Sequence, residues 1–334
     1  MLSDKLCALG GERKANMNSE ERVMRAVHFQ GPDRVPIVFF NRDFEQADLI
    51  LIDVVQHWAG ASKDTSEWEF RWEKLDETMG QPKGSLIHTW DEFEKLNIPN
   101  PYSPSRFDAV PGLMRKYSGK YYVASLGLSG FTIMTCLRGF AETLEDLYLD
   151  RENIERLANV VFSFEEEVIG QLKSYGFHAV FFADDWGTQT DLIVSPALWR
   201  DFFKPRYKKQ FDWAHKNGLD VYFHCCGQIE EIIPDLIEIG VDILNLSQPN
   251  LFNVKKLGER FGGKVCFLCP ISYQTTSLSG SKEDIYADAK SMIDNLGRTN
   301  GGFIGYIEEY HSIGLTEENY QNCVNAFRDL GRYP

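Results

Sequence analysis

The sequence has few basic side chains for its length and lacks any long hydrophobic run. Lysine and arginine number 35 against 49 aspartates and glutamates, which gives a formal net charge of −14. Nucleic-acid binding proteins need clustered Lys and Arg to contact phosphates, so this charge argues against that class. No apolar run reaches the roughly 18 residues that a membrane span requires, and the start MLSDKLCALGGERK is too polar for a signal peptide. We therefore expect a cytoplasmic protein that binds neither nucleic acid nor a membrane.

The cysteines do not form the pattern of a disulfide-stabilised protein. There are seven, an odd number scattered through a long chain, and the C-x-x-C spacing of redox proteins is absent at the adjacent pair Cys225 and Cys226. The isolated residues Cys7, Cys136 and Cys323 are predicted to be small buried hydrophobes. Clustered cysteines in a reducing compartment favour metal binding or catalysis instead.

Short apolar runs alternate with helical patterns along most of the chain. A helix is predicted over residues 18–29, and one long amphipathic helix over residues 143–175. The predicted strands are residues 35–40, 121–126, 178–183, 220–224, 241–246, 265–268 and 302–307. This alternation in 334 residues predicts an α/β fold, a (β/α)8 barrel, with an open doubly wound parallel sheet as the alternative. We expect a single barrel domain over residues 1–334, with about residues 1–34 as an N-terminal helical extension and the Trp- and Pro-rich residues 67–101 as a cap.

Reactive residues follow directly after four of the predicted strands. The four segments are DDWGTQ at 184–189, HCCG at 224–227, SQP at 247–249 and EEYH at 308–311. In a parallel barrel the carboxyl ends of all strands meet at one face, and active sites are built there. The sequence therefore predicts that these four segments converge on one site.

The segment YFHCCG at residues 222–227 is the most informative of these strand ends. Alternate side chains of a strand point the same way, so His224 and Cys226 can both face the barrel mouth while Cys225 points into the wall. A His-x-Cys pair offers two zinc ligands and needs a third from elsewhere. Spacing alone leaves four candidates for the third ligand, and it leaves open a catalytic cysteine or a purely structural role. The four candidates are Glu308, Glu309, His311 and Cys269.

Three long segments carry a resemblance to the uroporphyrinogen decarboxylase superfamily, and within it to the corrinoid-dependent methyltransferases. They read SPALWRDFFKPRYKKQFDWAH at 195–215, HCCGQIEEIIPDLIEIGVDILNLSQP at 224–249 and GGFIGYIEEYHSIGLTEENYQNCVNAF at 301–327. The opening NSEERVMRAVHFQGPDRVPI, residues 18–37, is also similar to the usual start of this family. The resemblance implies a (β/α)8 barrel, in agreement with the alternating pattern.

The motifs separate two branches of that superfamily. Decarboxylases carry an arginine-containing MRQAG-like segment after the first strand, and this chain has FFNRD at residues 39–43 instead. The methyltransferase branch carries His-x-Cys-Gly, which HCCG matches with His224 and Cys226. In thiol-methylating members of that branch a cysteine after the last strand is the third zinc ligand, and the alignment places Glu309 there. The resemblance therefore implies a zinc site of His224, Cys226 and Glu309, with Glu308 and His311 as alternative third ligands.

The segment DDWGTQ resembles O-demethylating methyltransferases, and this sets the expected reaction. Such an enzyme moves the methyl group of a methylated small molecule, here a methoxylated aromatic ether, to the Co(I) corrinoid of a partner protein. No Asp-x-His-x-x-Gly corrinoid motif is present in this chain, so we expect a separate corrinoid protein as the partner. A homodimer is compatible with the sequence.

The remaining site residues are assigned to catalysis or to substrate binding. Asp185 and Glu308 are the predicted catalytic residues, with Asp185 donating a hydrogen bond or a proton to the leaving oxygen. The predicted substrate-binding residues are Trp186, Gln189, Gln248, Tyr310 and His311. Two other functions are alternatives: a methylcobamide:thiol methyltransferase, favoured if Cys269 bound zinc, and a uroporphyrinogen decarboxylase-like lyase, favoured by basic residues in a metal-free pocket.

Overall fold

Eight parallel strands form a nearly closed barrel in the computed structural model, which describes residues 17–40, 42–55, 65–73, 81–308, 311 and 314–333. The order around the barrel is β1-β10-β9-β8-β7-β6-β5-β2. The strand bounds are β1 Ile37–Phe39, β2 Leu49–Asp53, β5 Tyr121–Leu128, β6 Ala179–Ala183, β7 Asp220–Cys225, β8 Ile243–Leu246, β9 Cys266–Pro270 and β10 Phe303–Ile307. The predicted (β/α)8 fold is confirmed, although β2 was not among the predicted strands.

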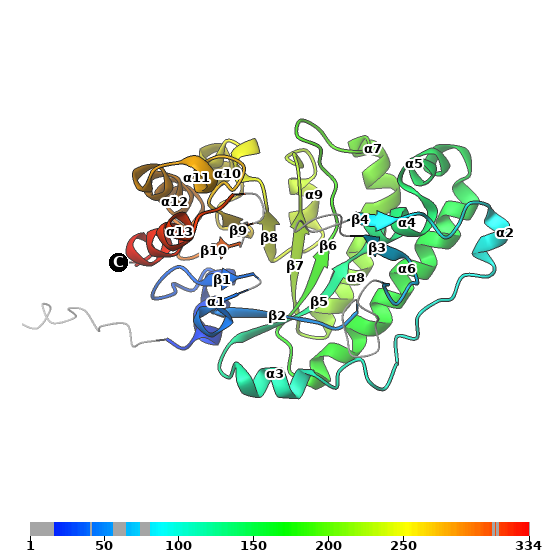
Figure 1. The fold of residues 1–334 in the computed structure, drawn as a ribbon, viewed down its shortest axis with the longest axis horizontal. Helices are drawn as coiled ribbons and strands as arrows, with labels where there is room; N and C mark the ends of the chain where they lie inside the picture. The colour runs from blue at the N-terminus through cyan, green and yellow to red at the C-terminus, as the bar shows by residue number, and fades with distance from the viewer. Residues whose placement is uncertain are drawn as a thin grey trace, which may run out of the picture.

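Helices surround the barrel and follow its strands along the chain (Figure 1). The longer ones are α4 Gly130–Arg138, α5 Phe140–Leu149, α6 Arg151–Leu172, α8 Lys204–Lys216, α10 Val254–Phe261, α12 Lys282–Leu296 and α13 Glu317–Leu330. Shorter segments connect them: α3 Val110–Lys116, α7 Pro196–Leu198, α9 Ile233–Glu238, α11 Thr276–Ser279, the 3-10 turns η1 Phe44–Gln46, η2 Lys173–Tyr175 and η4 Pro249–Leu251, and the π-helical turn η3 Trp199–Phe203. No helix among the described residues is long and apolar enough to cross a membrane.

The predicted single helix over residues 143–175 is wrong, because the chain breaks at Asp150. There α5 ends and α6 begins, and the Asp150 carboxylate accepts a hydrogen bond from the Asn153 backbone N–H at 3.4 Å. An aspartate that caps a helix start in this way competes with helix continuation. The amphipathic pattern continues across the break, which is why the sequence does not reveal it.

Two separate hydrophobic layers follow from the alternation of side chains along the strands. The barrel interior holds one layer, to which β7 contributes Tyr222 and β9 contributes Cys266 and Leu268. The layer between strands and helices holds the residues of opposite parity, including Phe223, Cys225 and Cys269. A side chain on a given strand therefore faces either the barrel axis or the helices according to its parity.

The predicted N-terminal helix closes the amino-terminal end of the barrel. Helix α1 Ser19–Val27 starts at Asn18, whose side chain accepts a hydrogen bond from the Glu21 N–H. Val23 and Val27 on its buried face join the interior layer of the barrel. The helix therefore covers the end of the barrel opposite to the carboxyl ends of the strands.

Strands β1 and β2 are neighbours at a seam of the barrel, but they are not paired by a ladder of backbone hydrogen bonds. The Asp48 side chain joins them instead. The Asp48 N–H donates to the Ile37 carbonyl oxygen at 2.8 Å, and the Asp48 carboxylate accepts from the Ile37 N–H at 2.9 Å. The same carboxylate accepts hydrogen bonds from Arg22 at 2.8 Å and Arg34 at 2.7 Å. Asp48 is only 1% exposed, so the barrel is closed here by a buried ion cluster.

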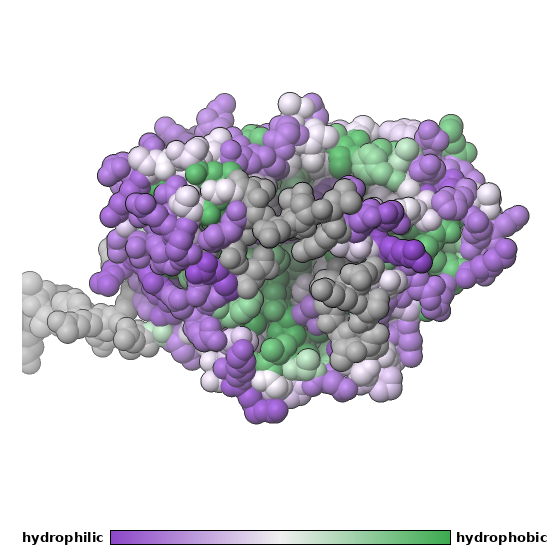
Figure 2. Space-filling view, viewed as in Figure 1, coloured by the Kyte–Doolittle hydropathy of each residue, from purple (hydrophilic) through white to green (hydrophobic). Residues whose placement is uncertain are grey.

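The part of the predicted cap that the structure describes contains a small hairpin and a short helix. Strands β3 Arg71–Glu73 and β4 Gln81–Lys83 pair antiparallel, and α2 Trp90–Phe93 follows. The indole of Trp68 packs on Phe164 of α6 with ring centroids 5.1 Å apart. Figure 2 shows mostly hydrophilic residues around the outline of the face seen in Figure 1, with hydrophobic residues gathered nearer its centre.

Candidate metal centre at the barrel mouth

Three potential metal ligands come together at the carboxyl ends of β6 and β7. One ligand atom each of Asp185, His224 and Cys226 lies within 4.8 Å of the other two. The His224 Nε2 atom is 3.6 Å from the Cys226 Sγ atom and 3.7 Å from the Asp185 Oδ1 atom. Within the described residues, this is the one group of three His, Cys, Asp or Glu side chains with such spacing.

The two adjacent cysteines have different environments. Cys225 belongs to the layer between strands and helices and is 1% exposed, while Cys226 is partly exposed. The Cys225 Sγ atom accepts a hydrogen bond from the Trp186 N–H at 3.1 Å. Burial raises the pKa of the Cys225 thiol well above its usual value, so the thiol stays neutral. The alternation of strand side chains predicts this difference, and it leaves Cys226 as the sulfur that faces the cluster.

The orientation of the His224 ring is fixed by a neighbouring strand. The Nδ1 atom lies 2.6 Å from the Asn245 Oδ1 atom, and the Asn245 Nδ2 group donates to the Leu268 carbonyl oxygen at 2.8 Å. Because the amide orientation is set by Leu268, the Asn245 oxygen accepts a proton that Nδ1 must carry. In the neutral form of the ring, Nε2 then presents its lone pair to Cys226 and Asp185. Metal-binding histidines are commonly oriented by such a partner.

Negative neighbours hold a proton on His224 when no metal is bound. Burial lowers the pKa of His224, but the hydrogen bond and charge of Cys226 and the charge of Asp185 outweigh it and raise the pKa to about 10. A metal cation must displace that proton to reach Nε2.

Asp185 is held against Cys226 because the β6–β7 pairing continues beyond the two strands. The Cys226 N–H donates to the Asp185 Oδ1 atom at 2.8 Å, and the Gly187 N–H donates to the Cys226 carbonyl oxygen at 3.1 Å. Two glycines allow this approach. A Cβ atom on Gly227 would lie 2.2 Å from the Gly187 backbone, and Gly227 has φ +79°. Only glycine adopts this conformation at this distance without strain.

We expect Gly227→Ala to destabilise the fold and, if zinc is the metal that this cluster binds, to weaken its binding. The added methyl group collides with backbone rather than with a movable side chain, and the positive φ adds to the cost, for a total of about 2–4 kcal/mol. The displaced Cys226 should bind zinc at least about tenfold more weakly. Urea unfolding and competition with a zinc chelator measure the two effects.

Gly112→Ala is the matched control for that substitution. Gly112 lies in α3, and a Cβ atom there meets nothing within 4 Å. This variant should keep full zinc affinity and gain stability, by up to about 1 kcal/mol. Equal behaviour of the two variants would contradict the role given to the Gly187–Gly227 contact.

Asp184, the neighbour of Asp185, has a structural role. It is fully buried, and its carboxylate accepts hydrogen bonds from the backbone of Phe131 at 2.9 Å and of Thr132 at 2.8 Å, at the start of α4. The Thr132 and Tyr207 hydroxyls also donate to it. Burial raises the pKa of Asp184 to about 7, against the effect of these donors. Of the two adjacent aspartates, Asp185 alone therefore reaches the cluster.

Trp186 and Gln248, two of the predicted substrate-binding residues, are packed into the protein. Trp186 is 0% exposed; its ring stacks on Phe131 at 4.4 Å, and its Nε1 atom donates to the Tyr207 hydroxyl at 3.1 Å. It has no exposed surface with which to contact a substrate, so the expected stacking is corrected to a wall position. Gln248 is 8% exposed and accepts the Gly227 N–H at 2.7 Å, which supports the backbone next to Cys226.

The other predicted residues lie on the rim, in the wall or outside the described residues. Gln189 is exposed and lies 3.5 Å from the Gln274 amide. His311 has contacts that include Glu317, at 3.4 Å, and the Tyr320 ring. Glu309 and Tyr310 lie outside the described residues. Cys269 is 0% exposed in the layer between strands and helices, and burial raises its thiol pKa to about 12.

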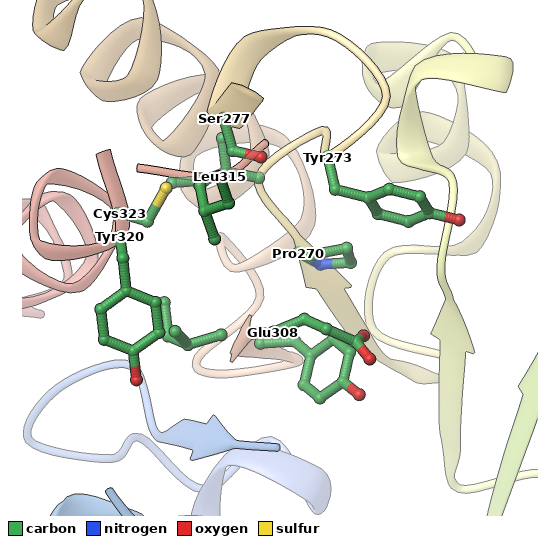
Figure 3. A pocket seen from close by; sticks show the side chains of 10 residues that line it. Pro270, Tyr273, Ser277, Glu308, Leu315, Tyr320 and Cys323 are labelled. Carbon is green, nitrogen blue, oxygen red and sulfur yellow. The ribbon is translucent and has the colours of Figure 1, made fainter. Parts of the chain in front are cut away.

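A small pocket at the carboxyl ends of β9 and β10 is lined by a residue that the sequence prediction missed. Tyr273, in the loop after β9, lines it together with Glu308 at the end of β10 (Figure 3). The Tyr273 hydroxyl hydrogen-bonds to Gln248, and burial together with the charges of Cys226, Glu308 and Asp185 raises its pKa. Nothing in the local sequence marks Tyr273, because its position depends on three loops that meet only in the folded barrel.

Reactive side chains gathered at the carboxyl ends of parallel strands define a (β/α)8 barrel with an enzyme-type site. The family model described as uroporphyrinogen decarboxylase (URO-D) matches residues 76–328. The chain therefore belongs to the uroporphyrinogen decarboxylase family. A search of curated proteins found no match.

Solved structures share the fold at low sequence identity. A methyltransferase from Methanosarcina mazei superimposes with a TM-score of 0.71 at 14% identity, covering 94% of this chain and 99% of that one. A D-psicose 3-epimerase from Clostridium cellulolyticum H10 is a looser match, with a TM-score of 0.46 at 9% identity, covering 87% and 94% of the two chains. At 14% identity, the likeness to the methyltransferase establishes the fold alone.

Proposed function

We propose that His224, Cys226 and a carboxylate hold a zinc ion at the barrel mouth. Nitrogen, thiolate sulfur and carboxylate oxygen are the donors that zinc prefers, and three protein ligands leave a position open for a substrate. Asp185 is the described carboxylate within reach of the other two ligand atoms. Glu309, assigned from the family resemblance, stays a prediction as a further ligand. The hydrogen bond between His224 and Asn245, which fixes the histidine tautomer, is the feature of the fold that best supports metal binding.

The function that this site supports best is methyl transfer from a methoxylated aromatic ether to the Co(I) corrinoid of a partner protein. The observation that carries this proposal is the cluster of N, S and O donors at the barrel mouth, with Tyr273 near enough for the charges of Cys226 and Asp185 to act on its hydroxyl. Family membership and the shared fold of the Methanosarcina mazei methyltransferase support this class of reaction. The sequence has no Asp-x-His-x-x-Gly corrinoid motif, and the proposal therefore takes the corrinoid from a partner protein.

Each part of the site has a task in that reaction. Bound zinc supplies a Lewis acid that stabilises the negative charge on the ether oxygen as its methyl group leaves. If Glu309 is the carboxylate that completes the zinc site, the side chain of Asp185, which is 49% exposed, is available to hydrogen-bond the leaving oxygen. Gln248 fixes both the Gly227 backbone and the Tyr273 hydroxyl, so the pocket wall and the metal ligands keep one arrangement.

The two alternative functions gain no support from the described residues. Thiol methylation with Cys269 as a ligand would need a sulfur that faces the barrel mouth, and Cys269 is buried in the wall. A decarboxylase would need basic side chains to hold its substrate carboxylates. Among the described residues that line the pocket there is no lysine, arginine or histidine.

The test is methyl transfer followed optically. Zinc-loaded protein is mixed with a reduced Co(I) corrinoid protein and a panel of methoxylated aromatics, and the loss of the Co(I) spectrum is recorded. We expect loss of Co(I) with at least one methoxyaromatic, and none with the corresponding phenols. An unchanged spectrum with every compound of the panel, at full zinc content, would remove this function.

A further inference from the structure

Helix α5 exposes a stripe of large hydrophobic side chains, although it has a buried face of its own at Leu147. Phe140 is 53% exposed, Tyr148 is 66% exposed and Leu149 is 82% exposed. Phe140, Leu144 and Tyr148 are four residues apart and share one face of the helix. Of the seven exposed large hydrophobic side chains among the described residues, three lie on this helix of ten residues. The α5 stripe, consisting of Phe140, Leu144, Tyr148 and Leu149, is therefore a cluster and not a scatter of single residues.

The α5 stripe lies on the side of the barrel that carries the metal cluster. Strand β5 ends at Leu128, and α4 and α5 follow before α6 leads back to the start of β6. Because the chain leaves a barrel strand at its carboxyl end, and the crossover helix returns it to the other end, α4 and α5 belong to the barrel mouth. Figure 1 shows α5 at the upper right and α3 at the bottom, and hydrophobic residues are visible in the same upper right part of Figure 2.

Two ring contacts connect the α5 stripe with the metal cluster. The ring centroid of Phe140 lies 6.3 Å from that of Phe131, and Phe131 stacks on Trp186 with centroids 4.4 Å apart. Trp186 directly follows Asp185 in the chain. The stripe therefore starts beside the wall of the site and continues outward from it along α5, and a protein that covers the cluster would also contact the stripe.

The charges on α5 distinguish a second copy of this chain from a different protein. Glu142 and Glu145 are exposed on the same helix, and neither has an ion pair among the described residues. Two copies that met through α5 would bring these carboxylates together, and each copy carries a formal net charge of −14. Like charges oppose such an association. The α5 stripe instead fits an apolar surface that is edged by lysine or arginine.

We propose that the α5 stripe is the surface on which the corrinoid protein docks. The inference rests on the proposed function and names the contact by which its partner is held. The cobalt of the corrinoid has to reach a substrate at the metal cluster, so the partner must cover the barrel mouth. An apolar centre with charged residues at its edge is the usual composition of an interface between proteins, and α5 presents both beside the cluster.

The experiment compares a protein-bound methyl acceptor with a free one. Tyr148→Gln/Leu149→Gln replaces two side chains of the α5 stripe with a polar residue that is compatible with a helix. Methyl transfer by the zinc-loaded full chain is followed with the Co(I) corrinoid protein and, separately, with free cob(I)alamin. We expect the KM for the corrinoid protein to rise at least about tenfold in this variant. The rate with free cob(I)alamin, which needs no docking surface, should stay at the wild-type value.

Direct binding of the partner gives a second measurement that does not depend on activity. Calorimetry with the corrinoid protein in its Co(II) form should show a Kd that is at least about tenfold higher for the double variant. Glu142→Gln/Glu145→Gln should slow association and reduce its dependence on salt, because the charges at the edge of an interface act mainly on the association rate. If the double variant does not fold, Leu149→Gln alone is used, with an expected loss of about threefold in affinity.

Met24→Gln is the matched control. Met24 is 42% exposed on α1, at the end of the barrel opposite to the mouth, so its replacement should leave the Kd for the corrinoid protein unchanged. An equal Kd for the wild type, Met24→Gln and the Tyr148/Leu149 double variant would overturn the inference. A wild-type chain that is a dimer in solution, and that the double variant converts to a monomer, would assign the stripe to a second copy and would also overturn it.

Binding and methyl transfer are scored separately, so that the two proposals can fail independently. Binding of the corrinoid protein that the double variant weakens, without methyl transfer to either acceptor, supports the docking surface and removes the methyltransferase function. Methyl transfer to both acceptors that the double variant leaves unchanged does the reverse. Absence of both binding and methyl transfer at full zinc content would overturn both.

Discussion

Replacing His224 or Cys226 with alanine is expected to remove zinc from the purified protein, from about one ion per chain to almost none. Each substitution deletes one of the described ligand atoms at the end of β7 and leaves two to hold the ion. Removing a residue that only hydrogen-bonds to a metal ligand lowers metal affinity by about 10–100-fold. Removing a ligand itself should therefore lower the affinity by more than about 100-fold. Methyl transfer should fall with the zinc content. Elemental analysis after dialysis against a weak chelator measures the effect.

The neighbouring cysteine provides the sharpest control for this prediction. Cys225→Ala removes a sulfur one position away, but that sulfur points into the layer between strands and helices, so zinc should be retained. Asn245→Ala is expected to give an intermediate result, about 10–100-fold weaker binding, because the His224 ring loses the acceptor for Nδ1. Retention of zinc in both His224→Ala and Cys226→Ala would contradict the proposed centre.

Asp48→Ala should produce the largest loss of stability, about 3–5 kcal/mol. The substitution leaves the buried Arg22 with Asp33 as its one remaining carboxylate partner and leaves the Ile37 N–H without its acceptor at the seam between β1 and β2. Removing one member of a buried ion cluster is costly because the remaining charged groups stay buried without their partner. A fall in the urea midpoint measures the loss, and zinc binding by the folded fraction should be unaffected.

A surface aspartate in an ordinary ion pair is the control for Asp48. Asp212 is 59% exposed and pairs with Lys208 one helical turn away, so Asp212→Ala should change stability by no more than about 0.5 kcal/mol. Asp48→Asn keeps an acceptor for the Ile37 N–H and should lie between the two. A loss below about 1 kcal/mol for Asp48→Ala would mean that the seam is held by other contacts.

Strand periodicity predicts most of the fold and the orientation of the central site residues. The alternation along residues 220–226 places His224 and Cys226 on one side and Cys225 on the other, because parity is a property of the strand itself. Strand β2, with the sequence LILID, was overlooked between two irregular segments although its apolar run is visible. The break at Asp150 was missed because the hydrophobic pattern of α5 runs on into α6.

Relations between loops could not be predicted from the sequence. Asp185 was expected to act on the substrate, and its approach to Cys226 depends on backbone pairing beyond the strands and on the contact of Gly187 with Gly227. Tyr273, in the loop after β9, is linked to the site by the hydrogen bond between its hydroxyl and Gln248. The distances between residues of different loops are set when the barrel closes. They do not correspond to any regular spacing of residues along the sequence.

The pairing of β1 with β10 has a consequence for the order in which the barrel can form. Strand β1 emerges early during synthesis, yet its hydrogen-bonded neighbour ends at Ile307, near the close of the chain. Strands β5 to β10 pair with successive neighbours and can assemble as they are made. Until β10 arrives, β1 has no ladder on either side, since at the seam Asp48 supplies a side chain instead. Closure of the ring therefore depends on a contact between the first and the last strand of the barrel.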